Sequence, residues 1–259
     1  MGTSLRYHGV RIGLRSSDPE ALSELVELMP PDMTSLGRGP VDRLYSVIRG
    51  GEVRGTRRYH LLYADALRIA RSFAWDEIKD ALRTDAEKFV AATCRDRVFV
   101  HAGVVALDGR AIVIPGRSGS GKTTLVQAFL RAGADYLSDE YAVVDPRGRV
   151  HAFPRLPMVR GADGTQRRES KESFAFRAPR QPLPLGLVAV VPYDAAQSFR
   201  ARDISAARGA LELMRNAPAA RSLPDMILQT LTRAASRARA VQGTRGDADS
   251  AVEELRRLM

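Results

Sequence analysis

Cysteine is almost absent from this chain: its 259 residues include a single one, Cys94. One thiol cannot form an internal disulfide, which fits a reducing compartment. Cys94 lies in an apolar stretch with helical spacing, so we expect a small core residue rather than a nucleophile. The sequence also lacks an apolar run of about 20 residues, the length that spans a bilayer. Its N-terminal segment lacks the apolar core of a secretory signal, so we expect a cytoplasmic protein.

Aromatic residues are few, at 6%, although the formal net charge is +10. The arginines are spread along the chain without a dense basic tract, and no stacking platform for bases stands out. Nucleic acid is therefore a disfavoured partner, and phosphate ligands or an acidic peptide explain the charge as well. Lysine is also scarce, with four residues against 36 arginines, yet position 122 is a lysine. A compact ammonium on a flexible stem fits inside a tight loop better than a guanidinium does.

The hydrophobic pattern predicts an α/β protein with two parts. Residues 1–94 form a small N-terminal α/β unit, and residues 95–259 form a second domain that ends in helices. In the first part we expect strands over residues 5–14, 43–48 and 58–63, a helix capped by Ser17 or Asp18, and a helix over residues 75–94.

The second part alternates strands and helices. Asp108-Gly109 is a strong hairpin signal between two apolar strands, residues 97–107 and 111–115. A helix is expected over residues 123–132, and a polar, basic loop over residues 160–183. Further strands are expected at 141–144, 150–153 and 185–191, and further helices at 204–212 and 225–240.

A glycine-rich loop joins the apolar strand that ends at Pro115 to the helix that follows. It has the pattern Gly-x-x-x-x-Gly-Lys-Thr, which in this strand–loop–helix context binds the phosphates of a nucleotide. Glycines let successive backbone N–H groups surround an anion, and the helix adds the positive end of its dipole. Lys122 is expected to reach the β- and γ-phosphates of ATP, and the Thr123 hydroxyl to ligate Mg²⁺. The expected phosphate-binding residues are Gly116, Arg117, Ser118, Gly119, Ser120, Gly121, Lys122, Thr123 and Thr124.

An acidic pair, Asp139-Glu140, lies one crossover after the loop helix, between apolar residues. An acid at the carboxyl end of a neighbouring strand can hold Mg²⁺ or act as a base, and a solvated turn is the alternative. His101 lies on the strand before the hairpin. That position favours a hydrogen-bonded structural histidine at least as much as a catalytic one.

These residues resemble the core of the HPr kinase/phosphorylase family. His101-Ala-Gly, the glycine loop, Arg131-Ala-Gly133 and Leu137-Ser-Asp-Glu140 follow the family's order, with similar spacing from His101 to Lys122 and on to Asp139. The resemblance covers residues 98–150 and extends weakly to small relatives such as lasso-peptide kinases. It implies a P-loop kinase core like the C-terminal domain of HPr kinase.

Carried over by that resemblance, Asp139 would be the base that deprotonates a Ser hydroxyl, and His101 would support the site. Thr123, with Asp139 and Glu140, would hold the metal. Glu140 stands where the family has Asp, and the family's downstream Glu-Cys-Arg-Gly-like run is absent. That places the phosphorolysis activity, and HPr as the substrate, in doubt. The family assembles as hexamers, so a homo-oligomer is one expectation.

Three functions follow from this sequence. The first is an ATP-dependent kinase that phosphorylates a hydroxyl of a peptide or small protein, including peptide natural products. The others are a kinase for a small metabolite and a nucleotide-binding regulatory module without transfer activity; ATP and GTP are not distinguished. Arg160, Arg167 and Arg168 are candidate phosphate contacts or plain solubilising charge. Residues 243–247 are a candidate second anion-binding turn or an ordinary loop before the last helix.

Overall fold

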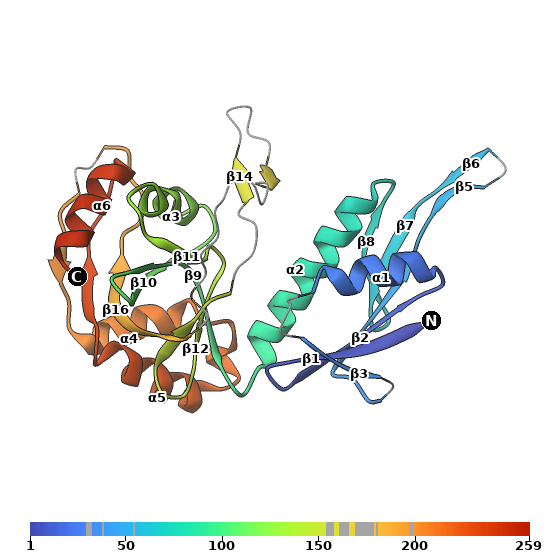
Figure 1. Ribbon diagram of the computed structural model, residues 1–259, viewed down its shortest axis with the longest axis horizontal. Coiled ribbons are helices and arrows are strands. Elements are labelled where there is room, and N and C mark those ends of the chain that lie inside the picture. The colour runs from blue at the N-terminus through green and yellow to red at the C-terminus, as the bar shows by residue number, and fades with distance from the viewer. Residues whose placement is uncertain are drawn as a thin grey trace. The chain divides into compact units, whose positions relative to one another are not determined.

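The computed structural model of this chain describes residues 1–29, 33–37, 39–53, 55–153, 158–160, 166–168, 179, 181–196 and 199–259. Contacts divide the chain into two compact units, Met1–Arg95 and Asp96–Met259 (Figure 1). Each unit combines a sheet with helices, so the prediction of a mixed α/β protein is confirmed.

The first unit is built on a six-stranded sheet with the order β3-β1-β2-β4-β7-β8. Residues 5–14, predicted as one strand, instead belong to two strands of a hairpin, because His8 and Gly9 turn the chain with φ angles of 47° and 83°. The strands are β1 (Gly2–Tyr7), β2 (Val10–Ser16), β3 (Thr34–Gly37), β4 (Arg43–Ile48), β7 (His60–Ala64) and β8 (Leu67–Ser72), and a separate hairpin joins β5 (Gly51–Val53) to β6 (Thr56–Arg58).

Two helices of this unit contact the sheet, α1 (Pro19–Glu27) and α2 (Trp75–Thr93). The Asp18 carboxylate accepts hydrogen bonds from two backbone N–H groups of the first turn of α1, as its predicted cap role requires. Ile78 and Leu82 of α2 are fully buried. Cys94 follows α2 and is also buried, so its predicted place in the core is confirmed.

The second unit has an eight-stranded sheet in which three parallel strands lie side by side. β10 (Arg110–Pro115) pairs in parallel with β16 (Leu183–Val190), which pairs in parallel with β18 (Arg239–Gln242). Their carboxyl ends therefore meet at one edge of the sheet. The other strands are β9 (Val98–Leu107), β11 (Asp135–Ser138), β12 (Tyr141–Val144), β13 (Arg149–His151) and β17 (Arg202–Asp203).

Helices cover both faces of this second sheet (Figure 1). α3 (Lys122–Arg131) and α6 (Ala248–Arg257) share one buried apolar cluster with the sheet. α4 (Ala206–Arg215), a short 3₁₀ turn η1 (Pro218–Arg221) and α5 (Pro224–Ala235) share the other. The helix predicted to reach residue 240 ends at Ala235, because the chain then enters β18.

The basic segment predicted as a loop contains a short hairpin. Its strands are β14 (Met158–Arg160) and β15 (Gln166–Arg168), which pair antiparallel. The prediction of a loop over residues 160–183 is wrong for Arg160 and for residues 166–168, which lie in these strands. Most of the remaining segment up to residue 183 lies outside the described residues, as do the side chains of Arg160, Arg167 and Arg168.

Candidate functional site

The glycine-rich loop connects the carboxyl end of β10 to the first turn of α3. Gly119 and Gly121 have φ angles of 81° and 80°, in the left-handed region that favours glycine. Gly121 is the N-cap residue of α3 and, as a glycine, has no side chain to accept hydrogen bonds from the first N–H groups of the helix. The first N–H groups of the helix are thus suited to an anionic ligand, to which the helix dipole adds.

The backbone of this loop folds tightly on itself. A Cβ atom on Gly116 would lie 2.6 Å from Ser120 Oγ, and one on Gly121 would lie 2.5 Å from an Arg245 nitrogen. Both contacts are shorter than a Cβ atom tolerates, so a larger residue at either position would displace the side chain of Ser120 or of Arg245. Arg117, Ser118 and Gly119, at the tip of the loop, are exposed.

Lys122 places its ammonium group inside the loop. Its Nζ donates hydrogen bonds to the carbonyl oxygens of Gly116 at 2.9 Å and Arg117 at 2.8 Å, and the residue is only 7% exposed. Burial lowers the pKa of Lys122, while the carboxylates of Glu140 and Asp139 act in the opposite direction. The two acids therefore lie close enough to influence the lysine of the loop.

Strand order explains how the acidic pair reaches the loop. Val104 of β9 pairs with Val113 of β10 and with Ser138 of β11, so β9 lies between these two strands. Two strand spacings place Ser138, the last residue of β11, roughly 10 Å from Val113 of β10. Asp139 follows directly; it is 8% exposed and accepts a hydrogen bond from the Tyr136 hydroxyl at 3.1 Å.

His101 joins the loop to the acidic pair. Its carbonyl oxygen accepts a hydrogen bond from the N–H of Gly116 at 3.3 Å, and its Nε2 lies 3.7 Å from Glu140 Oε1. Glu140 is held in turn by its own backbone, since its carbonyl oxygen accepts from the N–H of Ala102 at 3.1 Å. The structure thus brings together Lys122, Asp139, Glu140 and His101, which the sequence separates by up to 39 positions.

One residue at this site was not among the predicted site residues. Arg245 comes from the turn after β18, and its Nη2 donates to the carbonyl oxygen of Gly121 at 2.5 Å. The guanidinium lies 5.6 Å from the ring centroid of Tyr193, in the segment after β16, and Arg245 is 1% exposed. Burial lowers the pKa of Arg245, and the electrostatic effects of Tyr193 and Asp247 act in the opposite direction without cancelling it. The turn at residues 243–247 was a sequence candidate for anion binding, and its arginine contacts the loop backbone.

Metal ligation was predicted for Thr123, Asp139 and Glu140. Thr123 is half-buried in the first turn of α3, and Thr124 beside it is exposed. Across the described ranges, no group of three or more His, Cys, Asp or Glu residues is arranged to hold a metal ion. The same ranges contain no helix that is long and apolar enough to cross a membrane.

Comparison with solved structures gives distant likenesses only. No protein-family model matches the chain, and no curated protein matches it. A solved structure of the HPr(Ser) kinase/phosphatase from Coxiella burnetii is similar over 62% of this chain and 96% of that one. The sequence identity is 10% and the TM-score is 0.34.

Proposed function

We propose that this chain is an ATP-dependent kinase with a P-loop core resembling that of HPr kinase. It would bind the phosphates of ATP at residues 116–124 and transfer the γ-phosphate to a hydroxyl, a Ser of a peptide or small protein. The observation that carries the proposal is the buried Lys122 inside a glycine loop, with the carboxylates of Asp139 and Glu140 acting on it.

Phosphate binding follows from the loop itself. The ammonium of Lys122 already makes two hydrogen bonds within the loop, to carbonyl oxygens that carry only partial charge. Phosphate oxygens are stronger acceptors, so a bound triphosphate would compete for the same group. The N–H groups at the start of α3 would supply further donors, and a kinase needs this positioning more than covalent chemistry.

Three oxygen-bearing side chains would hold Mg²⁺ together with the phosphates. Carboxylate and hydroxyl oxygens are the donors that Mg²⁺ prefers, and Asp139, Glu140 and Thr123 supply both kinds. Mg²⁺ would neutralise charge on the phosphate groups. Asp139 and Glu140 also act on the pKa of Lys122, which is consistent with a shared site for metal and phosphates.

Asp139 is the proposed base for the acceptor hydroxyl. The hydrogen bond from Tyr136 orients its carboxylate, so that the proton of the acceptor hydroxyl would be accepted at a defined position. His101 would act through Glu140, which lies 3.7 Å from its ring nitrogen, rather than on the substrate. It is therefore a positioning residue in this scheme.

Incubation with γ-labelled ATP and with the peptides and proteins encoded beside this chain tests the proposal. A labelled protein or peptide is the expected product. Asp139→Asn should abolish labelling while ATP binding, measured without Mg²⁺, stays within about threefold, because this carboxylate acts on the acceptor and the metal rather than on the phosphates. Label on a small metabolite would support a metabolite kinase instead. Free phosphate alone, or no turnover, would support a regulatory module. Labelling by Asp139→Asn at the wild-type rate would disprove the base assignment.

A further inference from the structure

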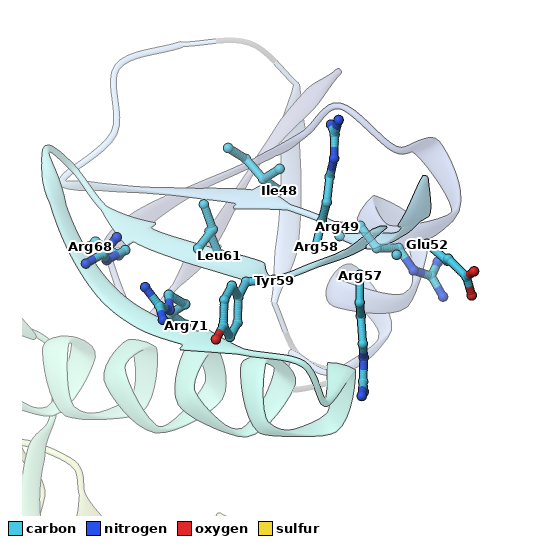
Figure 2. Close-up of a pocket in the computed structure, with 11 residues that line it drawn as sticks. Ile48, Arg49, Glu52, Arg57, Arg58, Tyr59, Leu61, Arg68 and Arg71 are labelled. Atoms are coloured by element: carbon cyan, nitrogen blue, oxygen red, sulfur yellow. The ribbon is translucent and has the colours of Figure 1, made fainter. Parts of the chain in front are cut away.

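The sheet of the first unit has one face that its helices do not cover. Leu62 and Ala64 of β7 are buried, and α2 contacts this strand. Successive residues of a strand point to opposite faces, so Leu61 and Tyr63 point away from the buried side. Within the described residues of this unit, no helix packs on that second face. It carries a groove of about 680 Å³ (Figure 2).

A bulge gathers charge on this face. Residues three apart on a regular strand point to opposite faces, but the register between β7 and β8 shifts at Leu62 and Tyr63. Arg71 consequently pairs with Leu61, and Arg68 pairs with Tyr63, so both arginines share the open face. The lining of the groove includes five arginines and one glutamate: Arg49, Arg57, Arg58, Arg68, Arg71 and Glu52.

Most of this positive charge is not neutralised by neighbours in the described ranges. Arg49 contacts the carboxylates of Asp18 at 3.4 Å and Glu24 at 3.2 Å. Arg58, Arg68 and Arg71 are exposed and make no ion pair with any described acidic residue. A cluster of like charges without counter-charges costs stability, and an anionic ligand relieves that cost.

Stacked rings hold two of the arginines in place. The Tyr59 and Phe73 rings stack with centroids 3.7 Å apart, Arg71 lies 3.9 Å from the Tyr59 centroid, and Arg57 lies 4.6 Å from the Phe73 centroid. A guanidinium held by its flat face keeps its N–H edges available, and the planar fork fits a carboxylate with two hydrogen bonds. The same stack engages both faces of Tyr59, which leaves no face there for a nucleic-acid base.

The groove also has apolar surface between its charges. Ile48, at the end of β4, is 47% exposed, and Leu61 lies on the neighbouring β7 (Figure 2). We infer that this groove binds an extended acidic segment of a partner peptide or protein. Asp or Glu side chains would pair with Arg58, Arg68 and Arg71, and an apolar side chain would lie on Ile48 and Leu61. This inference does not depend on phosphotransfer.

The inference is tested with a short fluorescent peptide of alternating Glu and Leu. Its binding to the full chain is measured by fluorescence anisotropy, without nucleotide. Arg58→Gln with Arg68→Gln should weaken binding at least about tenfold, since two charge-assisted contacts with the peptide are lost. Both side chains are exposed, so the fold should persist, as an unchanged circular-dichroism melt would show. Lys88→Gln with Arg95→Gln removes the same charge from exposed positions of the same unit and should change binding less than twofold.

Three results would overturn the inference. One is equal binding by wild type and by the Arg58/Arg68 double variant. Another is an equal loss in the Lys88/Arg95 control, which would mean that net charge alone attracts the peptide. The third is tighter binding of oligothymidylate than of the peptide, lost in the same double variant, which would make the groove a nucleic-acid site. Because no result depends on ATP, failure here would leave the proposed kinase activity untouched.

Discussion

Replacing Arg245 by methionine tests whether this buried arginine organises the nucleotide loop. Its Nη2 holds the carbonyl oxygen of Gly121 at 2.5 Å, and Gly121 is the N-cap of α3. The peptide group between Gly121 and Lys122 carries one of the N–H groups that would face a phosphate. We therefore expect Arg245→Met to loosen the loop and to weaken nucleotide binding.

The size of the effect follows from two opposing contributions. The lost hydrogen bond from a charged group is worth about 1.5–3 kcal/mol. However, Arg245 is 1% exposed and its Nε has no partner among the described residues, so its removal also relieves a cost of burying charge. Methionine fills a similar volume, so the free energy of unfolding should change by less than about 2 kcal/mol. Nucleotide affinity, which needs the ordered loop, should fall about 10- to 100-fold.

Calorimetric titration with ADP and Mg²⁺, together with urea unfolding, measures both quantities. Arg239→Met is the control, since Arg239 lies on β18 near the same turn but forms an exposed ion pair with Asp203 at 2.7 Å. That variant should keep both its urea midpoint and its nucleotide affinity close to those of the wild type, because an exposed ion pair contributes little to stability. If Arg245→Met binds ADP within twofold of the wild type, Arg245 has no role in ordering the loop.

Three further predictions concern the second unit. Lys122→Met should reduce ATP affinity about 100-fold, because the charge inside the loop is lost, and an equilibrium titration with unchanged affinity would disprove its phosphate role. Gly148→Ala should lower the free energy of unfolding by about 2–4 kcal/mol, because φ is +80° and the new Cβ would lie 2.9 Å from backbone atoms of α5. Gly109→Ala is the control: its φ is +73° but its Cβ would enter open space, so it should lower the free energy of unfolding by only about 1–2 kcal/mol. Burial alone would raise the pKa of Asp145, but the N–H of Arg149 and neighbouring donors lower it below its usual value. The wild type should therefore have a higher free energy of unfolding than Asp145→Asn above pH ~4, and this difference should shrink as the pH falls below that value. Urea melts that show the same difference at every pH would contradict the prediction.

Local signals in the sequence predicted the elements that local chemistry determines. Asp108 and Gly109 have φ angles of 49° and 73°, as their dipeptide indicates for a two-residue hairpin. Gly133, with a φ of 89°, follows the end of α3 as a glycine stop should. The His8-Gly9 turn was missed because apolar and polar residues alternate on both sides of it, which also describes one continuous strand.

The arrangement around the loop depended on strand order, which the sequence does not display. β10 and β16 pair in parallel although about 70 residues separate them, and β18 follows some 50 residues later. No local pattern specifies which buried strands become neighbours, since each is simply apolar. The order β10-β16-β18 is what brings Tyr193 and Arg245 to the glycine loop, so these two residues could not be assigned to the site from spacing.

Two cationic side chains of different shape therefore donate hydrogen bonds to different carbonyl oxygens of the same loop. Lys122 lies inside it and donates to two carbonyl oxygens, of Gly116 and Arg117, with an ammonium that can rotate toward another acceptor. Arg245 holds a third carbonyl oxygen, that of Gly121, with a planar group placed over the Tyr193 ring. A ligand that exchanges partners with the lysine need not disturb the arginine, because the two groups share no acceptor. In the proposed site, a phosphate would replace the carbonyl partners of Lys122 while Arg245 keeps its hydrogen bond to Gly121 at the start of α3.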